Sequence, residues 1–122
     1  MFRIDSNNIV TISRGDTGLF TIFINQGTEF APERYILQKD DKLYLGVMEP
    51  NQLFEDAIIK KVFDSTNVDD DGDVIVELQS KDTEHLLSGL YYYQLKLEKV
   101  EEETSAVTID TIRPNTRFYI ID

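Results

Sequence analysis

The stretch LSGLYYYQLKL, residues 87–97, decides the fold class of this chain. Large side chains recur at every second position and share one face of an extended backbone: Tyr91, Tyr93, Leu95 and Leu97. The opposite face carries Tyr92 and polar residues. Such alternation is typical of a β-strand that buries one of its faces. The stretch therefore predicts a strand over residues 90–99.

The same period of two recurs along most of the chain. Further strands are predicted over residues 9–13, 19–25, 42–50, 58–63, 74–78, 107–112 and 117–122. Turn-forming residues separate these runs, and loops are predicted over residues 26–32, 64–73, 101–105 and 113–116. Many short strands at this spacing indicate an all-β sandwich or barrel. The chain is 122 residues long, which indicates one domain, residues 1–122.

One short helical turn is predicted near residues 82–88. Asp82 is placed to cap the amides at its start, and Gly89 is placed to end it in the left-handed conformation. The turn would form a corner between two strands. Residues 51–57 are the only rival helical site.

Charge and composition exclude several classes of function. The formal net charge of −11 is a poor match to nucleic-acid phosphates and to an anionic membrane. There is no cysteine, so disulfides and thiolate chemistry are excluded. The N-terminal residues lack the apolar region of a signal peptide, and no run approaches the ~20 apolar residues of a membrane span. We therefore expect a soluble cytoplasmic protein that binds neither nucleic acid nor membrane.

No pattern of catalytic residues stands out. His85 is the only histidine, and no serine lies in a Gly-x-Ser-x-Gly motif. Pairs of carboxylates are abundant among 23 acidic residues, and a solvated acidic surface accounts for them. We expect a non-enzymatic protein without a cofactor.

The tripeptide Arg14-Gly15-Asp16 permits two interpretations. It matches an adhesion signal, which requires an exposed loop in an extracellular protein. It also suits a turn between strands, because Gly15 tolerates positive φ and Asp16 can accept hydrogen bonds from the amides that follow it. Without evidence of export, the sequence favours the turn.

Residues 67–78, NVDDDGDVIVEL, contain the best candidate metal site. Oxygen ligands at alternate positions and a glycine at the sixth match a calcium loop, but the twelfth position is Leu78 where such loops carry glutamate. A calcium- or ligand-binding β-sandwich using the acidic 67–73 loop therefore remains an alternative function. Its ligands would be Asp69, Asp71 and Asp73.

Several predicted strands carry apolar side chains on both faces, whereas a two-layer core needs only one. The surplus residues either form an interface with another protein or are covered by loops of the same chain. The candidate interface residues are Leu19, Phe23, Tyr44, Tyr92, Tyr119 and Ile121.

Two sets of motifs carry a resemblance to known families. Gly89-x-Tyr91-x-Tyr93 after a capped turn resembles the tyrosine corner of immunoglobulin-like domains. The order ISRGDTGLFTIFI, LQKDDKLYLGVME, IIKKVF, VIVELQSKDTEHLLSGLYYYQLKL, VTI and FYII resembles small phage and prophage proteins, similar to the N-terminal domain of phage upper baseplate proteins.

This resemblance implies a fold and a role. The fold would be an immunoglobulin-like antiparallel β-sandwich, in which Tyr91 bonds back to the preceding backbone and Arg14-Gly15-Asp16 is a turn between strands. The role would be structural, in a tail or baseplate, through self-association or contacts with other tail proteins. The location would be the host bacterial cytoplasm during assembly and then the virion.

Overall fold

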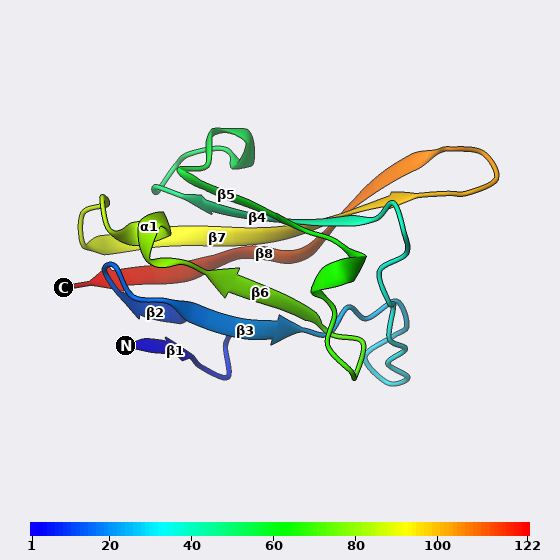
Figure 1. The fold of residues 1–122 in the computed structure, drawn as a ribbon, viewed down its shortest axis with the longest axis horizontal. Coiled ribbons are helices and arrows are strands. Elements are labelled where there is room, and N and C mark those ends of the chain that lie inside the picture. Colours follow the sequence, from blue (N-terminus) through cyan, green and yellow to red (C-terminus); the bar gives the residue numbers. More distant parts are fainter.

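The computed structural model describes all residues, 1–122, as a mostly β domain of two sheets (Figure 1). The strands are β1 Phe2–Ile4, β2 Val10–Ser13, β3 Gly18–Ile22, β4 Lys42–Met48, β5 Ile59–Phe63, β6 Val74–Leu78, β7 Gly89–Val100 and β8 Val107–Ile121. The helical elements are η1 Phe54–Asp56, η2 Ser65–Asn67 and α1 Ser80–Thr83. The all-β prediction is confirmed.

Six strands form one sheet in the order β1-β2-β8-β7-β4-β5, and β3 pairs with β6 in a second sheet. The pairing is not wholly antiparallel as expected, because β2 runs parallel to β8, with Val10 opposite Phe118. The predicted strand over residues 90–99 is confirmed as β7, and its alternate residues from Tyr91 to Leu97 are buried.

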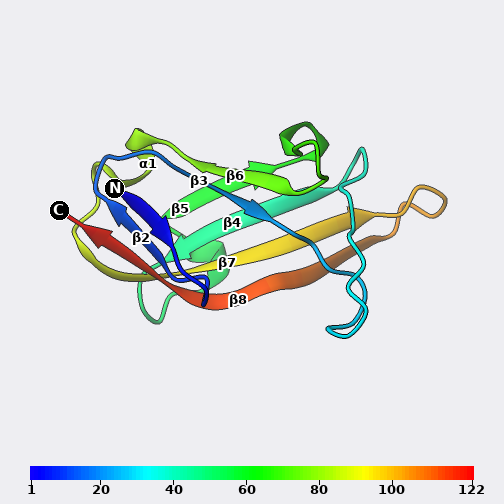
Figure 2. The ribbon, with the colours of Figure 1, turned by 90° about the horizontal axis from the view of Figure 1, so that it is seen from below.

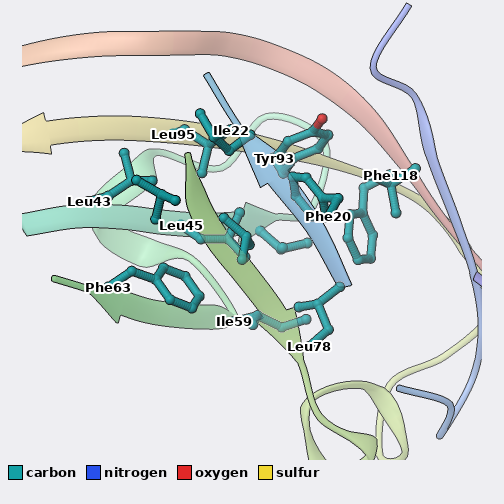
Figure 3. Packing of buried hydrophobic residues seen from close by; sticks show 14 of the residues in the cluster. Phe20, Ile22, Leu43, Leu45, Ile59, Phe63, Leu78, Tyr93, Leu95 and Phe118 are labelled. Atoms are coloured by element: carbon teal, nitrogen blue, oxygen red, sulfur yellow. The ribbon is translucent and has the colours of Figure 1, made fainter. Parts of the chain in front are cut away.

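The core lies between the two sheets (Figure 3). Phe20 of β3 packs edge-on against Tyr93 of β7, with the ring centroids 6.3 Å apart. Tyr93 in turn packs edge-on against Phe118 of β8 at 6.0 Å. Alternating residues of β6 complete the layer from the small sheet. The period of two in the sequence therefore reports the inner faces of both sheets.

The prediction of a loop over residues 113–116 is wrong, because β8 is a 15-residue strand that continues through these residues. Pro114 is tolerated for two reasons. The pairing of β7 and β8 is irregular here, with a register shift between Tyr93 and Leu95. On its other side β8 has no neighbour until Phe118, so no partner requires the missing N–H.

The predicted helical turn begins and ends earlier than expected. It spans Ser80–Thr83, and Asp82 is its third residue, accepting a hydrogen bond from the amide of Gln79 at 2.7 Å. Gly89 does not end it. Gly89 begins β7 with φ 150°, a conformation open to glycine, and so marks the strand start.

Strands β7 and β8 extend beyond the rest of the molecule as a hairpin that projects from one end (Figure 2). The hairpin turns at residues 101–106, which include the loop predicted over residues 101–105. The Glu101 amide donates to the Ala106 carbonyl at 2.9 Å. Every residue from 101 to 111 is exposed. We call residues 101–112 the hairpin tip.

Candidate interaction surfaces

The Arg14-Gly15-Asp16 turn joins β2 to β3 and is held at all three residues. Gly15 has the expected positive φ, 82°, and its amide donates to the buried Thr83 hydroxyl at 2.8 Å. The Arg14 guanidinium pairs with the Asp122 carboxylate at 2.7 Å. Asp16 pairs with the amino terminus rather than with the amides that follow it. Each residue thus has a partner within the domain, as a structural turn requires.

Tyr91 and Tyr93 lie on the inner face of β7 and fix the strand at its start. The Tyr91 hydroxyl donates to the Leu87 carbonyl at 2.6 Å, which is the backbone contact expected of a tyrosine corner. The Tyr93 hydroxyl donates to the Asn8 carbonyl at 2.5 Å and accepts from Arg113 at 3.1 Å. Burial raises the pKa of both phenols, so the hydroxyls remain donors.

The acidic loop does not gather its carboxylates. Asp69 accepts hydrogen bonds from the amides of Asp71 and Asp73, at 2.9 and 3.0 Å, and so closes a turn before β6. Asp73 pairs with Arg34 at 3.2 Å. The chain contains no group of three side chains arranged to hold a metal ion. His85, the only histidine, lies exposed after α1.

The six candidate interface residues do not form one surface. Alternation along the strands places four of them on the outer face of the six-stranded sheet: Tyr44, Tyr92, Tyr119 and Ile121. The other two, Leu19 and Phe23, lie on the outer side of the small sheet and are 56% and 44% exposed. The predicted interface therefore divides into two faces on opposite sides of the core.

Part of the large outer face is covered by the chain itself. Phe54 of η1 lies over Gly46, where a Cβ atom would come within 2.6 Å of the ring. Lys96 lies over the Phe54 ring at 4.6 Å from its centroid. Tyr44 is half-buried and donates to Glu98 at 3.3 Å. Burial, followed by the charge of Glu98, raises the pKa of this phenol.

The uncovered part of this face lies nearer the chain termini, where Leu90 of β7 is opposite Tyr119 of β8. We call this surface the outer patch: Leu90, Tyr92, Tyr119 and Ile121. Three of the four residues are partly exposed, and Ile121 is exposed. Sequence reasoning identified all of these residues except Leu90, which reads as the first residue of a strand.

The hairpin tip presents apolar residues that sequence reasoning did not select. Val107 and Ile109 are 55% and 63% exposed although they lie within a β-strand. Their alternation with polar residues had indicated an ordinary half-buried strand. The available signal was the β-branched run VTIDTI after an acidic turn, with no covering element predicted beside it.

Comparisons with known proteins identify no relative: no family model, no curated protein and no solved structure matches this chain. None of its helices has the length and apolar character needed to cross a membrane.

Proposed function

We propose that this chain is a non-enzymatic structural module of a phage or prophage tail or baseplate, acting through protein–protein contacts. The proposal combines the resemblance of its motifs with the surfaces described above. In this role the protein is made in the host bacterial cytoplasm and is then incorporated into the virion.

Two features support an immunoglobulin-like β-sandwich within this proposal. The two sheets face each other across one core, and the Tyr91 hydroxyl bonds back to the Leu87 carbonyl. The division into six and two strands departs from the four and three of constant-type immunoglobulin domains. The resemblance therefore concerns the facing sheets and the corner rather than the allocation of strands.

The outer patch is the observation that carries the assembly role. Tyrosine is enriched at the centres of protein interfaces, and contiguous exposed apolar surface marks association sites. The register places Leu90 opposite Tyr119 on β8, with Tyr92 next along β7. Tyr92 and Tyr119 can supply contact area with little loss of conformational freedom on binding.

Two measurements test the proposal. The first is mass spectrometry of purified phage particles from a strain that carries this gene, where the chain should be present as a particle component. The second is light scattering of the purified chain alone and with proteins encoded by the flanking genes. Tyr92→Ser and Tyr119→Ser should weaken the observed association, while Val62→Ser, which alters an exposed apolar residue on β5, should not.

The proposal is overturned if the chain is absent from particles and binds none of these proteins, itself included. An association that is unaffected by both tyrosine substitutions would instead move the contact away from the outer patch.

A further inference from the structure

The six-stranded sheet has a free edge along the hairpin. From Val107 to Arg117, β8 pairs with β7 on one side and with no strand on the other. Strand β2 reaches β8 only at Phe118–Ile121. The edge is therefore long enough to accept another strand.

The backbone of this edge is free to bond. The amide of Glu101 donates to the carbonyl of Ala106, and in an antiparallel pair such bonded pairs alternate with unbonded ones. The next residue pair, Val100 and Val107, therefore directs its polar groups away from the hairpin. On the β7 side this is seen directly, because the Val100 amide donates to Asp41. On the β8 side, Val107 and Ile109 point N–H and C=O into solvent.

From Val107 to Thr111 this edge lacks the devices that protect the other free edges of the sheet, because Pro114 and the register shift lie further along β8. Edge strands are usually kept from pairing by brevity, lysines, prolines or bulges. Strand β1 has only three residues, and β5 carries Lys60 and Lys61. Residues 107–112, VTIDTI, contain no lysine, proline or glycine. Five of the six are β-branched valine, isoleucine or threonine, and the sixth is Asp110.

We propose that the free edge of β8 pairs antiparallel with β8 of a second copy of this chain, about a two-fold axis at Ile109. The inference rests on the proposed assembly role and names its partner and its contact. It joins two six-stranded sheets into one continuous sheet across the dimer.

Side-chain complementarity supports a second copy as the occupant. Pairing centred on Ile109 sets Val107 opposite Thr111 of the other copy and keeps the two Asp110 carboxylates apart, because each lies opposite Thr108. In each of these pairs an apolar or hydroxyl-bearing side chain lies opposite another such side chain or opposite one carboxylate. No two like charges therefore lie opposite each other.

Charge complementarity favours the same arrangement. Because the two β8 strands run antiparallel, the turn of each copy lies toward the part of the other β8 that bears Arg113 and Arg117. The turn contains Glu101, Glu102 and Glu103. Arg117 is exposed and takes part in none of the four ion pairs of the chain. The acidic turn and this arginine therefore become partners only between copies.

Single cysteines test the register, because the natural chain has none. A residue on the two-fold axis lies opposite its own copy, with Cα atoms about 5.5 Å apart, within the range of a disulfide. Ile109→Cys should therefore give a covalent dimer on mild oxidation. Val107→Cys is the matched control, because its two copies lie about 14 Å apart along the strands and should not join. Mixing Val107→Cys with Thr111→Cys should give a mixed dimer.

A charge at the axis provides the second test. Ile109→Lys places two like charges directly opposite each other and should shift the mass measured by light scattering from the dimer to the 14.1 kDa monomer. Val62→Lys adds the same charge at a similarly exposed position on β5 and should leave the dimer intact.

The outcomes separate this inference from the proposed function. A wild-type chain that stays monomeric at all concentrations overturns the inference, as does a dimer in which Ile109→Cys joins no faster than Val107→Cys. If association then proves sensitive to Tyr92→Ser, the outer patch is the contact and the assembly role stands without β8 pairing. Binding of the edge to an extended segment of another protein, with no self-pairing, also overturns it.

Discussion

The two halves of β8 lie in contrasting surroundings although they belong to one strand. At Phe118–Ile121 the strand lies between β2 and β7, and Phe118 and Ile120 are buried in the core. In the hairpin tip the same strand has one neighbour, and Ile109 is largely exposed. In both halves large apolar residues recur at every second position: Val107 and Ile109 in the tip, and Phe118 and Ile120 in the core.

This difference shows that alternating side-chain types indicate the two faces of a strand. Whether a face is buried depends on what lies above the strand and beside it. Phe118 is buried because the small sheet covers it and β2 flanks it. Ile109 has no sheet above it, and only β7 lies beside it. Its apolar surface contributes to stability only when a partner covers it.

The largest expected effect comes from truncating one residue in each half. Phe118→Ala should lower the free energy of unfolding by about 3–5 kcal/mol, because it leaves a cavity beside Tyr93. Ile109→Ala should change it by less than about 0.5 kcal/mol. Urea unfolding at protein concentrations that keep the chain monomeric measures both. Equal losses would show that the tip is part of the cooperative core.

A smaller loss is expected beside the hairpin tip, where Val100 of β7 lies opposite Val107. The buried Asp41 carboxylate accepts hydrogen bonds from the Tyr35 hydroxyl and from the amides of Gln38 and Val100. Asp41→Ala leaves these donors without their acceptor and should cost about 2–3 kcal/mol.

Asp40→Ala is the matched control for Asp41→Ala, because Asp40 is the exposed neighbour and should have almost no effect on stability. Hydrogen exchange of the tip amides adds a second readout, which should quicken only when Asp41 is replaced. Unchanged exchange would show that the tip is ordered independently of Asp41.

Much of the fold was accessible from the sequence, because burial on one face leaves a period of two. For this reason residues 42–50, 58–63 and 74–78 each contain an observed strand, and residues 90–99 lie within one. The pairing partners of each strand could not be predicted from the sequence. The parallel pairing of β2 with β8 joins residues more than a hundred positions apart, and no local pattern encodes it.

The errors at the candidate sites have the same origin. Pro114 indicated a loop, but a free edge tolerates a residue that cannot donate a hydrogen bond. The candidate interface residues were selected as one set, and only the pairing of strands shows that Leu19 and Tyr119 lie on different sheets. The apolar tip was missed because its sequence matches that of a covered strand.

Substitution of two adjacent tyrosines on β7 by phenylalanine tests the two faces of the strand, with a smaller expected effect on the free energy of unfolding. Tyr91→Phe removes only the hydroxyl that donates to Leu87 and should cost about 1 kcal/mol, measured by urea unfolding. Tyr92→Phe alters the outer face and should cost almost nothing. The larger changes should diverge further, because Tyr91→Ala should unfold the domain while Tyr92→Ser should leave it folded. The reverse pattern would invert the assigned faces of β7.

The smallest effect on the free energy of unfolding near neutral pH comes from ionisation of the buried and half-buried tyrosines. Burial is the largest cause that raises the pKa of four phenols above the ordinary value of 10.0: Tyr35, Tyr44, Tyr91 and Tyr93. The folded chain therefore holds these protons more tightly than the unfolded chain does. The resulting stability is fully present below pH 10 and is lost as the pH rises through the folded pKa values.

Urea unfolding at a series of pH values between about 8 and 11, together with tyrosinate absorbance, measures this loss. None of the four tyrosines lies in the hairpin tip. Raising the pH should therefore destabilise the regions of the fold that hold these tyrosines rather than the tip. Tyr93→Phe, which removes the most deeply buried phenol, should make the alkaline decline shallower. A stability that stays constant as these phenols ionise would mean that they are in contact with water. The two halves of β8 would then differ less in their surroundings than the buried contacts of Phe118 indicate.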